Sequence, residues 1–469
     1  MRVILFGFDG LRPDLVTEQT SPNIAAVMAG GTRFANARSV FPSETRVATP
    51  SLATGCRPAS HGLVANALYD AAASPGRVLN TKHLVAMDAL IATHGRLLER
   101  PSLGAILHGV GKRMDVVWTG TAGAARAAFP EAGALGGFRW HPEEGVGAAA
   151  SIGPGPDSAV PNTPRVRHAA RLFIDHVLGE RRPDVALFWA SEPDVCFHYE
   201  GIGAPASLQA LRDADAALGE VLEWRAAQPD RDEIVIIAMS DHGHVTGHTR
   251  IDLVAELSAG GFACGRKLTA ETPIALGGGG APGLWVKGSD TATVRALCAW
   301  LQAQPWVGLV LARDAAAHGL AGTVPLAALG ALHARSPDLA FTFAGTDDPD
   351  QFGIPGRTFI EAADVPAGGG MHGGLHRREL SATLAMMGGP VPAGRVTETP
   401  SDLTDIAPTI LALLGLTPEG MDGVALAEAF GRDGGETRRV ILPGHGGAGL
   451  AMDHARGRAY PAGSGTGFG

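Results

Sequence analysis

The sequence predicts an α/β fold: a doubly wound, mostly parallel central sheet with helices on both faces, and an inserted cap region. Several short apolar runs end in polar residues, which is typical of strands buried on both faces of a parallel sheet. Segments with helix start and stop signals lie between these runs, so strand and helix alternate along the chain. The clearest strand candidates cover residues 3–8, 115–118, 185–190 and 234–239.

The segments between these runs are expected to form crossover helices. Ser21-Pro22 precedes residues 23–29 and Gly30-Gly31, an order that predicts an N-cap, a proline at the first helical position and a glycine stop. Further helices are predicted over residues 102–110, 206–225 and 405–414.

Composition and patterning divide the chain into three parts. Its 469 residues include 65 glycines and 32 prolines, and 45% of them are hydrophobic, which is enough to bury a large core. The alternation weakens after about residue 245, and the last stretch has few apolar residues. We predict a catalytic core of residues 1–245 and 371–430, a cap of residues 246–370, and a Gly-rich C-terminal segment of residues 431–469 that wraps the surface or is partly mobile.

Charge and apolar content argue against several classes of partner. A net charge of −9 with no basic run argues against bulk nucleic-acid binding, which needs clustered Lys and Arg. The first apolar run is too short for a signal peptide, and no stretch approaches the ~18 apolar residues of a membrane span, so we expect a cytoplasmic protein with no membrane partner. The sequence indicates no oligomeric state. The cysteines are far apart and are predicted to be reduced, buried thiols: Cys56, Cys196, Cys264 and Cys298.

Carboxylates and histidines follow the predicted strands, at the sheet edge where parallel sheets bind ligands. Each residue alone is weak evidence, because an Asp after a strand is often a cap or turn residue. Together they form a donor set that suits Zn²⁺ and has enough members for two ions about 4 Å apart, although Mn²⁺ or iron would also accept it. The donors are Asp9, Asp194, His198, Asp241, His242 and His372.

Short motifs around these donors occur in an order and spacing that resemble the alkaline phosphatase superfamily, and within it most the nucleotide pyrophosphatase/phosphodiesterase group. The resemblance extends from Phe6-Gly7-Phe8-Asp9-Gly10 to Asp422-Gly423 and misses much of the proposed cap. Its other motifs are Phe41-Pro42-Ser43-Glu44-Thr45, Thr54-Gly55, Ser60-His61-Gly62, Tyr69-Asp70, Glu192-Pro193-Asp194, Ser240-Asp241-His242-Gly243, His372-Gly373-Gly374 and Asp405-Ile406-Ala407-Pro408-Thr409.

The resemblance implies a phosphoric diester hydrolase that works in two displacement steps through a phospho-threonine. It implies Thr45 as the nucleophile and Asn66 as a donor to a non-bridging phosphoryl oxygen. A threonine hydroxyl needs a nearby cation to lower its pKa, which explains the metal donors. The implied zinc ligands are Asp194, His198 and His372 for one ion, and Asp9, Asp241, His242 and Thr45 for the other.

Two of these assignments have rivals in the sequence. Ser43 is also a loop hydroxyl, and Thr49-Pro50 has the local pattern of an N-cap followed by the first helical residue. Thr45 is favoured because it lies nine residues before Thr54-Gly55, the distance at which the family it resembles places its nucleophile. His445 repeats the His-Gly-Gly pattern, but the place of His372 ahead of residues 405–414 favours His372.

The substrate contacts are harder to predict. Arg46 stands where nucleotide-cleaving relatives often have an aromatic residue; it either pairs with an anionic group of the substrate or faces solvent. His376 is a candidate substrate contact, and His244 and His248 are candidate supporting partners or substrate contacts. His61 is expected to order the loop that carries Asn66.

The ester class follows from a missing cationic pair. Monoesterase and phosphonoacetate hydrolase relatives place two basic residues after a mid-chain strand, whereas here the strand at residues 115–118 is followed by Thr119-Gly120-Thr121. Unless Arg46, Lys112 or Arg113 substitutes, the site should prefer a small-molecule phosphodiester. The alternatives are a phosphonoacetate hydrolase-like or phosphomonoesterase activity and, outside enzymes, a metal-stabilised binding protein.

Overall fold

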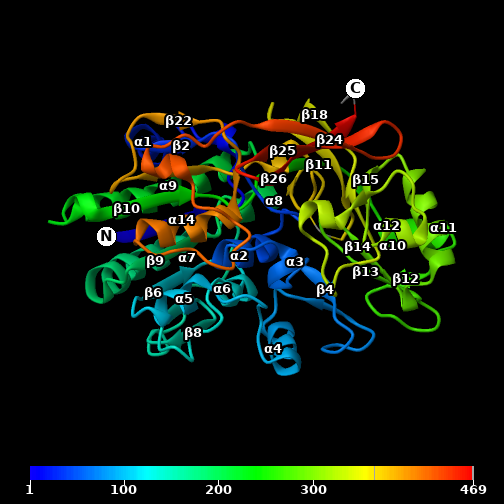
Figure 1. The fold of residues 1–469 in the computed structure, drawn as a ribbon, viewed down its shortest axis with the longest axis horizontal. Helices are drawn as coiled ribbons and strands as arrows, with labels where there is room; N and C mark the ends of the chain where they lie inside the picture. The colour runs from blue at the N-terminus through cyan, green and yellow to red at the C-terminus, as the bar shows by residue number, and fades with distance from the viewer. Residues whose placement is uncertain (364, 467–469) are drawn as a thin grey trace.

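The fold is built on a nine-stranded sheet, seen in a computed structural model that describes residues 1–363 and 365–466 (Figure 1). Five of its eight strand pairs are parallel, which confirms the predicted mostly parallel sheet. The strands are, in spatial order, β22 (Arg395–Thr397), β2 (Thr32–Phe34), β21 (Leu384–Met387), β10 (Ile234–Met239), β1 (Arg2–Phe8), β9 (Val185–Ala190), β6 (Met114–Trp118), β7 (Phe138–His141) and β8 (Glu144–Gly147).

Helices cover both faces of this sheet because its central strands bury alternate side chains on opposite sides. Val3 and Leu5 of β1 pack on one face, and Ile4 and Phe6 on the other. The first face packs against α2 (Thr45–Thr54), α5 (Leu103–Gly109), α6 (Ala122–Ala128) and α14 (Ile406–Leu413), and the second against α1 (Pro22–Gly30), α7 (Thr163–Leu172) and α9 (Pro205–Ala226).

The predicted strands and crossover helices of the core are all present within one or two residues of their expected ends. At the start of α1 the Asn23 backbone N–H donates a hydrogen bond to Asp215 Oδ2 of α9, whereas the side chain of the predicted cap, Ser21, makes no capping hydrogen bond. Among the described residues, no helix is both long and apolar enough to cross a membrane. The four cysteines are buried and free.

The chain between β10 and β21 forms two further sheets, which lie to the right of the central sheet in Figure 1. The six-stranded sheet packs against α10 (Leu253–Ala259) and α11 (Thr291–Gln302). Its order is β12 (Cys264–Gly265), β13 (Ile274–Gly277), β14 (Gly283–Val286), β17 (Leu339–Phe343), β15 (Val307–Ala312) and β16 (Val324–Pro325), and the four-stranded sheet has the order β18 (Gly345–Pro349), β19 (Pro355–Glu361), β11 (Val245–Ile251) and β20 (Gly370–Met371).

The C-terminal segment differs from the expectation that it wraps the surface or is partly mobile. Up to residue 466 it forms an antiparallel sheet of β24 (Arg438–Pro443), β25 (Ala448–Ala455) and β26 (Arg458–Thr466), drawn in red in Figure 1. Leu450 and Met452, two residues apart on β25, bury one face against Leu309 and Leu311 of β15. These two side chains of β25 thus point to the same face, as alternation along a strand requires; residues 467–469 lie outside the described residues.

The remaining elements are short or lie at the edges of the core. The helices among them are α3 (Pro58–His61), α4 (Leu84–His94), α8 (Asp194–Glu200), α12 (Ala315–His318) and α13 (Arg377–Leu380). Two short strand pairs complete the fold: β3 (Ala37–Arg38) with β23 (Ser401–Asp402), and β4 (Ala67–Tyr69) with β5 (Val78–Asn80).

Candidate active site

The predicted donors converge at the carboxyl ends of three adjacent parallel strands. Asp9 follows β1, Asp194 begins the helix after β9, and Asp241 follows β10. His198 lies one turn after Asp194 on α8, so both side chains lie on the same face of that helix. His372 joins them because β20, directly before it, pairs with β11.

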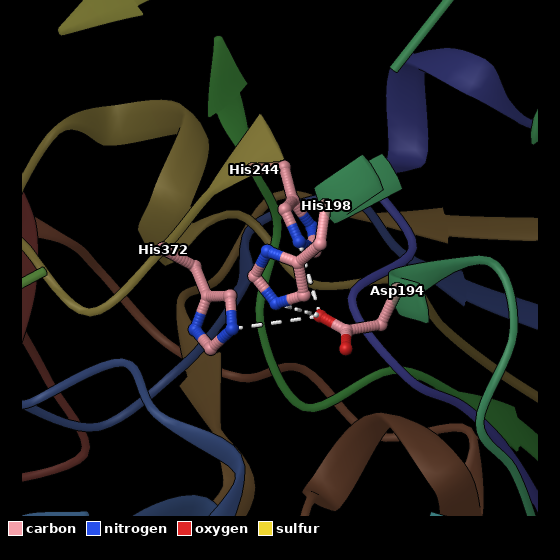
Figure 2. A group of neighbouring side chains, drawn as sticks. All are labelled: Asp194, His198, His244 and His372. Carbon is pink, nitrogen blue, oxygen red and sulfur yellow. Dashed lines mark ion pairs between the residues drawn. The ribbon is translucent and has the colours of Figure 1, made fainter. Parts of the chain in front are cut away.

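One group of donors surrounds the Asp194 carboxylate (Figure 2). Asp194 Oδ1 lies 3.2 Å from His198 Nε2, 3.5 Å from His372 Nε2 and 3.0 Å from His244 Nε2. In the figure, the three rings point towards this one oxygen from different sides. A single oxygen shared by three imidazoles is the arrangement expected around a bound cation.

Backbone carbonyls fix the orientation of these rings. His198 Nδ1 lies 2.7 Å from the carbonyl oxygen of Gly370, and His372 Nδ1 lies 2.8 Å from that of Ser43. A carbonyl oxygen only accepts, so in both rings Nδ1 is the nitrogen that donates a proton. The lone pair of a neutral ring is therefore on Nε2, as is usual when histidine binds a metal through Nε2 and donates its other N–H.

A second group of donors is formed by Asp9, Asp241 and His242. His242 Nε2 lies 3.5 Å from Asp9 Oδ1 and 3.4 Å from Asp241 Oδ2. Asp241 Oδ1 accepts hydrogen bonds from the backbone N–H groups of Gly10 and His242, and Trp189 Nε1 donates to Asp9 Oδ2. The remaining oxygen of each carboxylate thus faces the group.

The electrostatics of both groups favour a cation. Burial raises the pKa of Asp241 to about 8, with the charge of Asp194 adding to it, and burial together with Asp241 and Asp194 raises the pKa of Asp9 well above its usual value. Burial lowers the pKa of His242 to about 3 and that of His372 well below its usual value, so these imidazoles are neutral. Asp194 Oδ1 and Asp241 Oδ2 are buried without a hydrogen bond to any described residue. These residues fit a metal centre, because a cation would compensate both carboxylates.

Thr45 is the predicted nucleophile that the structure brings to these donors. Its Oγ1 lies 3.2 Å from Asp9 Oδ1 and 3.2 Å from His242 Nε2, at the first residue of α2. The Ser43 hydroxyl donates instead to the carbonyl oxygen of Gly374. Thr49 is not an N-cap: it lies within α2, and its hydroxyl donates to the carbonyl oxygen of Thr45. The first turn of α2 thus presents Thr45 to the second group, with the positive end of the helix dipole beside it.

The loop that follows α3 places Asn66 beside the start of α2. Asn66 Oδ1 accepts a hydrogen bond from the backbone N–H of Arg46, and the Asn66 backbone N–H donates to Glu44 Oε2. This orientation leaves the side-chain NH₂ of Asn66 as the group available to donate to a ligand. Asn66 lines the same cavity as Thr45.

That cavity has a volume of about 1010 Å³, and besides the acidic Glu44 and Glu143 its wall carries four basic side chains. Arg46 is part of the wall and is half-buried, with its Nε donating to Thr81 Oγ1. Lys112 and Arg113 precede β6 and lie at the opposite end of this strand from Thr119, and Lys112 pairs with Asp184. The basic side chains that line the cavity are Arg46, Lys82, Arg165 and Arg266.

His376, the predicted substrate contact, lies outside the residues that line this cavity, and its role stays a prediction. Its Nδ1 accepts from the backbone N–H of Arg378 and forms a capping box with Glu379 at the start of α13. His445 lies in the turn between β24 and β25, outside both donor groups.

Two features of the site have little or no signal in the sequence. His244 was expected only as a supporting residue or substrate contact, although it lies as close to Asp194 as the predicted ligands do. The loop between β13 and β14 packs against the backbone of His372: a Cβ atom on Gly280 would lie 2.0 Å from the His372 carbonyl oxygen. Both contacts join segments distant in sequence, so only the tertiary structure reveals them.

Comparison with known proteins agrees with this geometry. Residues 3–261, more than half of the chain, match the family model for type I phosphodiesterase / nucleotide pyrophosphatase. The venom phosphodiesterase CdcPDE of Crotalus durissus collilineatus is 24% identical over 245 residues, which cover 51% of this chain and 26% of that protein. The bis(5'-adenosyl)-triphosphatase enpp4 of Xenopus laevis is 37% identical over 82 residues, 18% of each chain. This chain thus matches only about a quarter of the length of the venom enzyme.

Solved structures share the fold. Murine ectonucleotide pyrophosphatase / phosphodiesterase 5, determined as an inactive variant in complex with AMP, superimposes with a TM-score of 0.65 at 17% identity, covering 90% of this chain and 97% of that one. The human protein of the same name gives the same values. From the family match, the chain belongs to the type I phosphodiesterase / nucleotide pyrophosphatase family, within the alkaline phosphatase superfamily that its motifs resemble.

Proposed function

We propose that this protein is a metal-dependent phosphodiesterase of the nucleotide pyrophosphatase type that hydrolyses a small-molecule phosphodiester. The observation that carries the proposal is the Thr45 hydroxyl, 3.2 Å from both Asp9 Oδ1 and His242 Nε2, in a cavity that also exposes Asp194 and His372. Family membership supports the same reaction class.

Two Zn²⁺ ions fit the two donor groups, one with Asp194, His198 and His372, the other with Asp9, Asp241, His242 and Thr45. When bound, such ions lower the pKa of a hydroxyl nucleophile and stabilise negative charge on the leaving oxygen. Mn²⁺ or iron ions would satisfy the same carboxylate and imidazole donors.

The residues of the chain then carry the two displacement steps. Thr45 Oγ1 bonds to phosphorus as the bond to the leaving oxygen breaks, and the leaving alcohol takes up a proton. Water next attacks the phosphorus and breaks the bond to Oγ1, which releases a phosphate monoester and restores the Thr45 hydroxyl. The Asn66 NH₂ donates to a non-bridging oxygen in both steps, and Arg46 lies beside it to balance negative charge.

The basic wall of the cavity favours a substrate with a second anionic group. Arg46, Lys82, Arg165 and Arg266 line the cavity, whereas its aromatic residues other than the metal donors are few: His83 and Tyr199. A phosphodiester with an additional phosphate or carboxylate would meet these cations. The same observation supports the second candidate, a phosphomonoesterase or phosphonoacetate hydrolase-like activity, in which Arg46 would balance the extra charge.

Metal analysis and a substrate panel test the proposal. Purified protein should contain about two zinc ions per chain and hydrolyse bis-p-nitrophenyl phosphate with a higher kcat/KM than p-nitrophenyl phosphate, in a chelator-sensitive manner. Thr45→Ala should lose about 10³-fold in kcat/KM, whereas the matched control Thr49→Ala, a buried threonine of the same helix, should stay active. A tenfold or greater preference for the monoester would favour the second candidate. Bound metal without turnover of any ester or phosphonate would favour a binding protein.

A further inference from the structure

His244 directs its Nε2 atom at the Asp194 group. Its side chain is fully buried, and its Nε2 lies 3.0 Å from Asp194 Oδ1 without making a hydrogen bond to any described residue. Its Nδ1 lies 2.9 Å from the carbonyl oxygen of Gly10. Since that carbonyl only accepts, Nδ1 donates, and the lone pair of the neutral ring is on Nε2, directed at the carboxylate.

A lone pair and a carboxylate oxygen repel each other at this distance unless a cation lies between them. Asp194 Oδ1 likewise makes no hydrogen bond to a described residue. Donors bound to tetrahedral zinc at about 2.0–2.1 Å are about 3.3 Å from one another. The three distances from Asp194 Oδ1 to histidine Nε2 atoms, 3.0, 3.2 and 3.5 Å, lie around this value. His244 therefore matches the geometry of the two predicted histidine ligands.

The surroundings of His244 hold its ring in this position. Gly10 has a φ of +70°, and a Cβ atom there would lie 2.2 Å from His244 Cε1. A Cβ atom on Gly370 would lie 3.0 Å from His244 Cδ2. Phe197 contacts the ring edge-on, with centroids 5.3 Å apart. The absence of side chains at these two glycines thus leaves space for the imidazole, and these contacts orient its Nε2 towards Asp194.

We propose that His244, through Nε2, is a fourth protein ligand of the ion held by Asp194, His198 and His372. This inference rests on the proposed two-ion function. It makes the two ions unequal: one has a carboxylate and three imidazoles, the other two carboxylates, one imidazole and the Thr45 hydroxyl. Of these donors only Thr45 takes part in the reaction, so the ion beside Asp194 would have four non-reacting protein ligands, as is typical of tightly held zinc, and the other ion would have three. The ion beside Asp194 should therefore be retained longer against a chelator.

Zinc binding without substrate tests this assignment. Metal-free wild type, His244→Leu and the control His248→Leu, whose ring lies outside both groups, would be titrated with Zn²⁺ in competition with a chelating dye. His244→Leu should lose at least about tenfold in affinity at one of two sites. His248→Leu should keep both affinities. If His244→Leu keeps both wild-type affinities, the assignment is wrong.

A crystal structure of the wild-type protein loaded with Zn²⁺ tests the same point without depending on a variant that folds. With anomalous scattering at the zinc edge, His244 Nε2 should lie about 2.0–2.3 Å from an ion. Two bound ions with His244 Nε2 more than about 3 Å from both would overturn this inference and leave the proposed function standing. Binding of no ion at all would overturn both.

Discussion

His242 and His372 stack face to face, with ring centroids 3.6 Å apart and ring planes inclined by 14°. His242 belongs to the donor group of Asp9 and His372 to that of Asp194, so the stack joins the two candidate metal sites. Ions about 3.5–4 Å apart are typical of two-metal phosphoryl-transfer sites. Because the sites share this contact, a substitution in one group should also alter metal binding at the other.

Asp241→Asn tests the link between metal and stability. Asparagine keeps an oxygen for the hydrogen bonds from Gly10 and His242 but removes the charge that a cation would meet. Zn²⁺ at 1,000 times its Kd should increase the free energy of unfolding of the metal-free wild type by about 4 kcal/mol, which raises its Tm. The same zinc concentration should raise the Tm of Asp241→Asn much less. Differential scanning calorimetry measures this, with the exposed Asp348→Asn as control. Equal zinc stabilisation of both variants would show that Asp241 is not a ligand.

Gly280→Ala tests whether the inserted region positions His372. The new Cβ atom would lie 2.0 Å from the His372 carbonyl oxygen, so the backbone at this ligand must move. Misplacement of a catalytic group by about 1 Å can cost about 10²-fold in rate, and we expect a loss of this size in kcat/KM together with weaker zinc binding. Gly109→Ala is the control, because a Cβ atom there meets nothing within 4 Å. Full activity in Gly280→Ala would mean that the loop can yield without moving His372.

Arg46→Ala tests the basic wall. Arg46 lines the cavity next to Thr45, so its removal should weaken the recognition of substrates that carry an extra negative charge. The kcat/KM for p-nitrophenyl phosphate should fall about tenfold or more, and that for bis-p-nitrophenyl phosphate should fall less. Arg46→Lys, which keeps the charge without the planar fork, should recover part of the difference. An equal fall for both substrates would argue against a role in charge recognition.

The pH dependence of stability tests the contact between the inserted region and the loop after Asn66. Burial opposes the charge of Asp70, but hydrogen bonds from the Ala73 backbone and Arg335 lower its pKa from 3.8 to about 2. Because the pKa of this carboxyl is lower in the folded than in the unfolded state, its ionised form stabilises the fold above pH 3.8. This stabilisation is lost as the pH falls towards 2. Asp70→Asn should cost about 2 kcal/mol at pH 7, since buried Arg335 loses a carboxylate partner and keeps only Glu99, 3.5 Å away, and the carbonyl oxygen of Gly62. His94 Nε2 lies 2.8 Å from the same carboxylate, so the comparison is made at pH 5 and below. Melting curves should show this deficit shrinking as the pH falls from 5 to 3; a deficit unchanged over that range would contradict the assignment.

The sequence predicted the core strands and helices because their signals are local. Apolar runs such as that of β1, and the turn residues between them, do not depend on distant contacts. The start of α2 was harder to predict from the sequence. Thr49-Pro50 has the local pattern of a helix start, yet the helix begins at Thr45 and includes Pro50. Hydrogen bonds to Asn66, from a separate loop, stabilise that earlier start.

Other features depend on the tertiary structure. His244 faces Asp194 because the Gly10 carbonyl, distant in sequence, orients its ring. His376 stands near predicted ligands in sequence but caps a helix, which proximity along the chain did not reveal. The basic side chains of the cavity come from separate segments, so no motif contains them. The domain limits and a cytoplasmic location stay predictions.

The stereochemistry at phosphorus tests the displacement at Thr45 most directly. A single stereoisomer of an aryl phosphorothioate diester would be hydrolysed in ¹⁸O-labelled water, and the configuration of the product determined by ³¹P NMR. Two in-line displacements, the first by Thr45 and the second by water, predict net retention of configuration. Net inversion would mean that water attacks the diester directly, and would contradict Thr45 as the nucleophile.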